Sequence, residues 1–145
     1  MKILGIDLGD RWVGSALSDG LGITCKPYKT VQIDELGTFI EKVLKSERVR
    51  TVVVGYPRTF SGGESAQTAK IVDHKQKLEQ LYGDIDGQPV TWILWDERLS
   101  SKRASEVQRG ASSAEAKQKS HSIAAAFILQ SYLDNLAFRD GVNEQ

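Results

Sequence analysis

Two short runs of β-branched and aromatic residues, TVVVG at residues 51–55 and VTWILW at residues 90–95, limit the folds open to this chain. Continuous apolar runs of this length are typical of strands covered on both faces, as in parallel sheets. A segment with helical spacing of apolar residues precedes each run, near residues 34–46 and 66–82. Parallel strands joined by right-handed helical crossovers are therefore expected.

The first 31 residues predict a different arrangement of strands. Residues 2–9 and 12–19 are two strand-like segments joined by only two residues, which indicates a hairpin. A third strand over residues 23–31 must accommodate Pro27, and proline is tolerated at the edge of a sheet because it cannot donate to a ladder. An antiparallel meander of three strands is therefore expected to open the fold.

Helical spacing predicts four helices. Asp34 is expected to cap the first, which ends near Ser46. The second follows the Gly/Ser-rich loop and ends near Tyr82, the third lies between about residues 100 and 110, and the fourth begins near Lys117. The first helix is expected to bury Leu36, Phe39, Ile40, Val43 and Leu44, and the second Ile71, Val72, Lys75, Leu78 and Leu81.

This order of elements predicts an α/β fold with a mixed five-stranded sheet flanked by helices. Three strands form the antiparallel meander and two later strands are parallel, which is the ribonuclease H-like arrangement. A chain of 145 residues suits one domain. We expect that domain over residues 1–138 and a disordered tail over residues 139–145.

Composition excludes several classes of protein. Cys25 is the only cysteine. A single cysteine excludes an intramolecular disulfide framework and a cysteine-based zinc cluster, and we expect Cys25 to be a small residue of the core. No apolar stretch is long enough to span a bilayer, and the first residues do not resemble a secretory signal. We therefore expect a cytoplasmic protein without a membrane partner.

Charge is balanced over the whole chain, with 19 basic and 19 acidic residues, but not locally. Residues 98–119 hold six basic and two acidic side chains. A solvated helix face is the common explanation of such a run. A surface that binds nucleic acid is the alternative, and the run begins directly after Glu97, a candidate site residue.

Three motifs carry a resemblance to a known family. They are GIDLGDRWVGSALSD at residues 5–19, WDERLSS at residues 95–101 and SHSIAAAFILQSYLD at residues 120–134. In order and spacing they resemble the motifs of the YqgF, or RuvX, family of Holliday junction resolvases and pre-16S rRNA nucleases, over nearly the whole chain. The resemblance implies a ribonuclease H-like nuclease in which Asp7 and Glu97 are catalytic carboxylates.

Phosphodiester cleavage explains why such carboxylates are needed. Cleavage adds negative charge to an anionic centre, and a divalent metal ion held by carboxylates neutralises that charge and activates water. Asp7 in mid-strand and Glu97 at the end of another central strand can converge if the two strands lie side by side. Asp7 could instead form a structural ion pair, and Glu97 could simply precede a helix. Asp96 points to the opposite side of the strand and is expected to be structural.

His121 stands where the family usually has an aspartate. A neutral imidazole can coordinate a metal but brings no charge, and it suits Mn²⁺ better than Mg²⁺. We therefore expect Asp7, Glu97 and His121 to be the catalytic, metal-binding residues, with Mg²⁺ or Mn²⁺ as cofactor. A half-buried helix histidine without a ligand role is the open alternative.

Basic residues near these positions are expected to contact the phosphate backbone of the substrate without reading its sequence. The loop after residue 55 departs from the family pattern, and it is either a phosphate-binding loop with Arg58 or an ordinary turn. Trp12 can stack on an unpaired base or pack in the core. The expected substrate-binding residues are Arg11, Arg58, Arg98, Lys102, Arg103 and Arg109.

The function implied by the resemblance is metal-dependent endonucleolytic cleavage of structured nucleic acid, most of all 5′-end processing of pre-16S rRNA in ribosome biogenesis. Resolution of Holliday junctions in DNA recombination and repair is the alternative, and a non-catalytic nucleic-acid-binding module is a further one. The partner is therefore pre-rRNA or branched DNA, bound by a monomer or a homodimer. Two symmetric cuts in a junction require the dimer. Sugar kinases share the first motif, but they need a second lobe for which this chain has no room.

Overall fold

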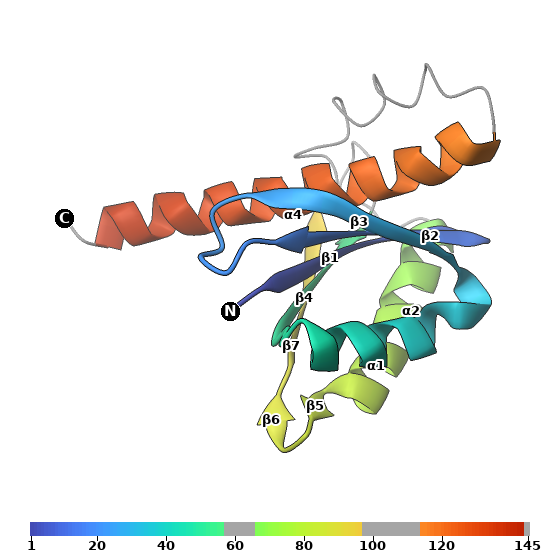
Figure 1. Cartoon of the computed structure of the whole chain (residues 1–145), viewed down its shortest axis with the longest axis horizontal. Helices are drawn as coiled ribbons and strands as arrows, with labels where there is room; N and C mark the ends of the chain where they lie inside the picture. Colours follow the sequence, from blue (N-terminus) through green and yellow to red (C-terminus); the bar gives the residue numbers. More distant parts are fainter. Residues whose placement is uncertain (57–65, 97–113, 144–145) are drawn as a thin grey trace.

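Five strands form one mixed sheet in the order β3–β2–β1–β4–β7 (Figure 1). The computed structural model describes residues 1–56, 66–96 and 114–143, and of residues 66, 67, 114–119 and 140–143 it describes the backbone alone. The strands of this sheet are β1 (Ile3–Leu8), β2 (Trp12–Ser18), β3 (Cys25–Gln32), β4 (Thr51–Tyr56) and β7 (Thr91–Asp96).

The directions of the strands confirm the expected sheet. β1, β2 and β3 form an antiparallel meander, whereas β4 is parallel to β1 and β7 is parallel to β4. β3 carries Pro27 and lies at the edge of the sheet, as the sequence predicts. β4, with its run of three valines, lies between two parallel neighbours and is buried on both faces.

Helices cover both faces of the sheet (Figure 1). α1 (Leu36–Ser46) and α2 (Ala66–Tyr82) lie on one face, and α4 (Ala114–Asn143) crosses the other, in contact with β1, β2, β3 and β4. No helix in the described ranges is both long and apolar enough to cross a membrane. The helix expected between about residues 100 and 110 lies outside these ranges.

Strand alternation divides the apolar residues into two clusters. On β1, Leu4 and Ile6 point to α1 and α2, whereas Gly5 and Asp7 point to α4. We name the clusters after the helices that cover them. The α1–α2 cluster includes Leu4, Ile6, Leu8, Val13, Ile40, Val52 and Val54. The α4 cluster consists of Ala16, Val53, Ala125, Ile128, Leu129, Tyr132 and Leu133, with smaller flanking contacts.

Side-chain hydrogen bonds fix α4 along the outer strand. The backbone N–H of Cys25 donates to the side-chain oxygen of Gln130 at 3.2 Å, and the side-chain nitrogen of Gln130 donates to the carbonyl of Ile23 at 3.0 Å. The thiol of Cys25 donates to the carbonyl of Ala126 at 3.2 Å. Burial raises the pKa of this thiol to about 11, so Cys25 acts as the small packing residue that the sequence predicts.

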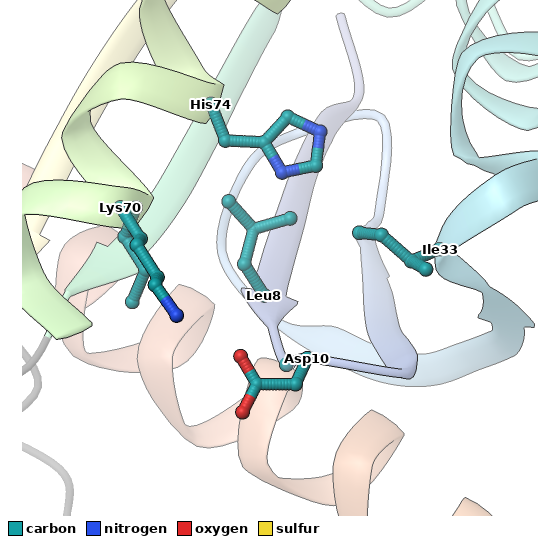
Figure 2. A pocket seen from close by; sticks show the side chains of 7 residues that line it. Leu8, Asp10, Ile33, Lys70 and His74 are labelled. Atoms are coloured by element: carbon teal, nitrogen blue, oxygen red, sulfur yellow. The ribbon is translucent and has the colours of Figure 1, made fainter.

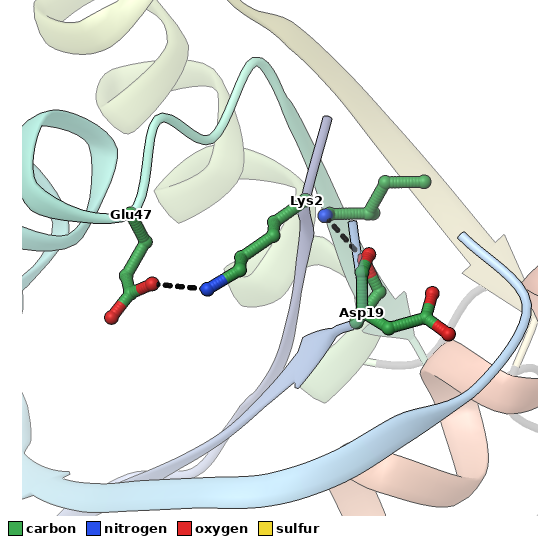
Figure 3. Close-up of polar contacts among 5 residues, drawn as sticks. Lys2, Asp19 and Glu47 are labelled. Atoms are coloured by element: carbon green, nitrogen blue, oxygen red, sulfur yellow. Dashed lines mark hydrogen bonds and ion pairs between the residues drawn. The ribbon is translucent and has the colours of Figure 1, made fainter. Parts of the chain in front are cut away.

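The far end of β1 is tied to α1 by charge. Lys2 and Glu47 form an ion pair of 2.6 Å, and the amino group of Met1 donates to the carbonyl of Gly20 at 3.1 Å (Figure 3). The Lys2–Glu47 pair is partly exposed, so it contributes little stability but restricts how β1 lies against α1. These contacts are at the opposite end of β1 from Asp7.

One local expectation differs from the structure, and one further pair of strands was not expected. Asp34 lies within a 3-10 helix (Ile33–Glu35), and no side chain caps α1. Between α2 and β7, the two short strands β5 (Asp84–Ile85) and β6 (Gln88–Pro89) form a hairpin. At its turn, residues 86 and 87 have φ of 52° and 79°, the Asp-Gly signature of a type I′ turn.

The ends of two helices also differ. Leu81 is 70% exposed, and Tyr82 packs against the α1–α2 cluster in its place. The carbonyl of Tyr82 accepts a hydrogen bond from the indole of Trp92 at 3.0 Å, which fixes this last turn of α2. α4 continues to Asn143, although we expected a tail from residue 139.

Candidate metal-binding site at the end of strand β1

Asp7 lies near the end of β1 between two glycines. In the sheet register its neighbours are Gly14 on β2 and Gly55 on β4. Residues in register point to the same face, so no side chain stands directly beside the carboxylate on either strand. The side chain of Asp7 is 17% exposed and faces α4. The strands on both sides of Asp7 therefore place no side chain beside its carboxylate.

Gly14 also allows α4 to lie directly on the sheet. A Cβ atom added at Gly14 would overlap the carbonyl of His121 and lie 2.6 Å from the backbone nitrogen of Ser122. At Gly5, the added atom would lie 2.8 Å from Cβ of Leu129. Since a side chain at either position would push the helix away, these glycines set the depth at which α4 crosses the sheet.

This close approach brings His121 to Asp7. Nδ1 of His121 lies 3.7 Å from Oδ2 of Asp7, a distance too long for a hydrogen bond. The Nδ1 atom is buried and has no hydrogen-bond partner among the residues that the structure describes, although the ring as a whole is 30% exposed. A buried polar atom without a partner is unfavourable and needs an explanation. The two side chains thus face each other across a gap that neither fills.

A divalent cation fits this gap. Metal–ligand distances for small divalent ions are about 2.1 Å, so two ligands of one ion can be up to about 4.2 Å apart. The observed 3.7 Å lies between that limit and a hydrogen bond. An imidazole nitrogen beside a carboxylate oxygen is a donor set that Mn²⁺ accepts readily. In the ranges that the structure describes, however, no three His, Cys, Asp or Glu side chains gather at one point.

Glu97, the other expected ligand, lies outside the described residues. It follows directly after Asp96, the last residue of β7. The strands of the two expected carboxylates do not lie side by side, because β4 pairs with both β1 and β7. In register with Asp7 across the sheet are Gly55 and then Trp95. The condition of neighbouring strands is therefore not met, and the strand between β1 and β7 contributes a glycine at this level.

Of the expected substrate-binding residues, the structure describes Arg11. It is exposed in the turn between β1 and β2, and its guanidinium lies 5.8 Å from the ring centre of Trp12. This turn is closed by a hydrogen bond of 3.0 Å from the N–H of Gly9 to the carbonyl of Trp12. The remaining expected contacts, Arg58, Arg98, Lys102, Arg103 and Arg109, lie outside the described residues.

A small hollow lies on the other face of the sheet (Figure 2). It has a volume of about 150 Å³ and is lined by Leu8, Asp10 and Ile33 opposite Lys70 and His74 of α2. Burial, followed by the charge of Lys77, lowers the pKa of His74. His74 is therefore partly covered rather than a plain surface residue, because the end of the first hairpin packs over α2. Its polar groups are too few and too varied to hold a metal.

Gly55 is the site residue that the sequence analysis did not assign. Its importance comes from the register of β4 against β1, which no local pattern encodes. The glycine at the end of an otherwise β-branched run was the available signal, since glycine inside a strand often marks a close approach.

Comparison with known proteins places these observations in a family. The family model of RuvX, described as Holliday junction resolvase, matches residues 1–135. A protein of Desulfitobacterium hafniense is 36% identical over 154 aligned positions that cover the whole of both chains. One from Staphylococcus aureus is 37% identical over 142 positions, covering 93% of this chain and 96% of its own. Both carry the name "Putative pre-16S rRNA nuclease".

Solved structures support the fold. Thermus thermophilus RuvC in complex with a Holliday junction substrate superposes with a TM-score of 0.57 at 17% identity, over 90% of this chain and 91% of RuvC. The yeast mitochondrial Holliday junction resolvase gives a TM-score of 0.50 at 10% identity, over 90% of this chain and 77% of its own. At such identities the likeness concerns the fold alone, and it confirms the ribonuclease H-like arrangement.

Proposed function

We propose that this chain, which belongs to the RuvX family, is a metal-dependent nuclease that cuts phosphodiester bonds in the 5′ region of the pre-16S rRNA. The observation that carries the proposal is that Asp7 lies 3.7 Å from Nδ1 of His121, a buried atom without a hydrogen-bond partner in the described part of the chain. The names of the relatives, which span the same length of chain, support rRNA as the substrate. Members of this group of nucleases generally use divalent metal ions.

Three residues have separate roles in the proposed metal site. Asp7 supplies a charged oxygen ligand and His121 a neutral nitrogen ligand. Gly14 holds the His121 backbone against β2, so the imidazole is positioned before any ion arrives. A bound divalent ion would neutralise charge on the scissile phosphate and activate the attacking water. The protein part of the mechanism is thus to position two ligands, with no side chain of β2 or β4 in register beside Asp7.

Glu97 is proposed as the second carboxylate. Trp95 belongs to the α4 side of the sheet, and alternate residues of a strand share a face. Gly55 lies in register between Asp7 and Trp95 and has no side chain. At this level β4 therefore places nothing between Asp7 and the end of β7. Two acidic ligands would balance the charge of a divalent ion, which Asp7 alone does not do.

Resolution of Holliday junctions is the second candidate function. The description of the matching family model favours it, as does the fold shared with RuvC. Resolution needs two coordinated cuts and hence a dimer, whereas cleavage of an rRNA precursor does not. A third candidate, binding without cleavage, is motivated by His121, which gives the site one charge less than an aspartate would.

A cleavage assay tests the proposal. A pre-16S rRNA fragment and a four-way DNA junction are each incubated with the protein in Mg²⁺ or in Mn²⁺. We expect cleavage of the RNA, loss of at least about 100-fold in rate for Asp7→Asn, and no change for the matched control Asp34→Asn, an exposed residue outside the site. Cleavage by Asp7→Asn at the wild-type rate would overturn the nuclease assignment.

The identity of the metal is tested at His121. The His121→Asp substitution replaces nitrogen by a charged oxygen and is expected to raise activity in Mg²⁺ relative to Mn²⁺, because Mg²⁺ prefers oxygen ligands. The ratio of the two rates is the measurement. An unchanged ratio would mean that His121 does not contact the ion.

A further inference from the structure

Trp12 is placed unlike the other two tryptophans. Trp92 is buried and its indole N–H donates to the carbonyl of Tyr82. Trp95 donates to Ser131 at 3.1 Å and packs edge-on against Tyr132 with ring centres 5.3 Å apart. Trp12 is half-buried, and among the described residues it is a member of neither apolar cluster. Packing in either apolar cluster therefore does not account for the position of Trp12, whose ring keeps part of its surface exposed.

Trp12 lies on the same face of the sheet as Asp7. On β2, Gly14 is in register with Asp7, and Trp12 is two residues away on the same side of the strand. Such diagonal neighbours have Cα atoms about 7–8 Å apart, within reach of an aromatic side chain. A bound nucleotide whose phosphate lies at Asp7 therefore has its base within reach of Trp12.

Gly9 lies close to both Trp12 and His121. A Cβ atom added there would lie 2.5 Å from the carbonyl of Trp12 and 3.5 Å from Cε1 of His121. Gly9 thus stands between the imidazole and the backbone of Trp12 without a side chain. The end of the first hairpin, which carries Arg11 and Trp12, therefore lies close to the imidazole of His121.

Arg11 lies beside Trp12 at the end of the same hairpin. Its guanidinium lies 5.8 Å from the ring centre of Trp12, near the outer limit of a cation–π contact, and its side chain is exposed. An exposed contact of this kind is weaker than the stacking of a base on an aromatic ring. A base can therefore displace the guanidinium from the ring, and the freed Arg11 can pair with a flanking phosphate.

We propose that Trp12 and Arg11 form a stacking subsite for an unpaired nucleobase, at or next to the bond that is cut. This inference rests on the proposed nuclease function and adds a substrate requirement to it. Paired bases in a duplex are stacked on each other and do not offer a face to Trp12, so the subsite selects nucleic acid that is single-stranded at the cut. Stacking does not read the sugar, so the selection is the same for RNA and DNA.

Binding without cleavage tests the subsite. Full-length protein carrying Asp7→Asn is titrated in metal-free buffer with a single-stranded decamer and with a blunt duplex of the same sequence, each as RNA and as DNA. Adding Trp12→Ala is expected to weaken binding of both single strands about ten-fold and to change duplex binding less than two-fold. Trp12→Phe is expected to retain most of the affinity, because it keeps an aromatic face. Leu21→Ala, an exposed apolar residue of the β2–β3 turn, is the control and is expected to bind as the parent does.

Intrinsic fluorescence provides a readout that a packing role would not move. Quenching by the single-stranded decamer is expected in the parent and is expected to be lost in Trp12→Phe, which still contains Trp92 and Trp95. Equal losses for single strand and duplex, or no loss for either, would overturn the subsite. If Trp12→Ala binds and cleaves as the wild type does while Asp7→Asn is inactive, the stacking subsite is contradicted and the nuclease function still stands. If binding prefers single strands in a way that depends on Trp12 while Asp7→Asn cleaves fully, the subsite stands and the proposed role of Asp7 in cleavage is contradicted.

Discussion

The two faces of the sheet are built from different kinds of residue. The face under α1 and α2 presents large aliphatic side chains, such as Leu4 and Ile6, which are fully buried. The face under α4 presents Gly5, Gly14 and Ala16 at the crossing point, so the backbone of α4 lies directly on the strands. One face is built to bury apolar surface, and the other is built to bring the helix close.

Adjacent residues of β1 show what this difference achieves. Ile6 points into the α1–α2 cluster, whereas Asp7 points towards His121. Apolar burial on the first face stabilises the sheet. On the second face a carboxylate lies opposite an imidazole whose Nδ1 has no hydrogen-bond partner within the described ranges. The comparison predicts that substitutions on the two faces affect different measurements.

The largest effect on stability is expected for Ile6→Ala. The substitution removes a fully buried side chain and leaves a cavity, so it should lower the free energy of unfolding by about 2–5 kcal/mol. Urea denaturation followed by circular dichroism gives this value. A loss below about 1 kcal/mol would mean that the α1–α2 face is not the main source of stability.

Gly14→Ala is expected to have the next largest effect. The added Cβ would meet the backbone of His121, so α4 must shift outward, at about 1–3 kcal/mol and with weaker metal binding. Gly20→Ala is the matched control, because its added Cβ meets nothing within 4 Å. If both variants are equally stable and bind metal equally well, the close approach of α4 does not position the site.

Asp7→Asn is expected to separate function from stability. The amide has the shape of the carboxylate but not its charge, so the free energy of unfolding should change by less than about 1 kcal/mol or increase slightly. Metal binding should be lost at the same time. A loss of stability of more than about 2 kcal/mol would indicate that Asp7 is a structural residue of the α4 face.

The smallest expected effect concerns His74 in the hollow on the α1–α2 face. Burial lowers the pKa of His74 in the folded protein below its ordinary value of 6.5, so the unfolded chain takes up the proton at higher pH. The stability that neutral His74 contributes is therefore present above pH 6.5 and is lost as the pH falls through 6.5 towards the lower folded pKa. The free energies of unfolding at pH 7.5 and 5.5, measured by urea denaturation, should differ less in His74→Gln than in the wild type, and this reduction should be under about 1 kcal/mol. An identical difference in both proteins would assign the pH dependence to other groups.

Much of the fold could be predicted because local patterns encode it. The valine-rich run of β4 indicates a central strand, and Pro27 indicates the edge position of β3. The hairpin at Asp86–Gly87 was predictable too, since Asp-Gly is the strongest short-range turn signal, but it was overlooked beside the weak strand pattern of its flanks. Leu81 shows the limit of helical spacing, because positions three and four after Leu78 are both compatible with the inner face and the structure uses Tyr82.

The site was only partly predictable for a different reason. Asp7 and His121 could be named from motifs, but their meeting depends on how deep α4 lies on β2, which Gly14 decides. The position of β4 between β1 and β7 is a property of sheet order, and it places Gly55 beside Asp7 although the two are 48 residues apart in the sequence. Such long-range registers arise from the assembly of the whole sheet and not from any segment.

The claim that Asp7 and His121 hold one divalent ion together is tested most directly by calorimetric titration of the apo protein with Mn²⁺. The wild type is compared with Asp7→Asn and with His121→Ala. We predict a single site whose affinity falls at least about ten-fold in each variant, as expected for loss of a ligand. Wild-type affinity in both variants would contradict the account.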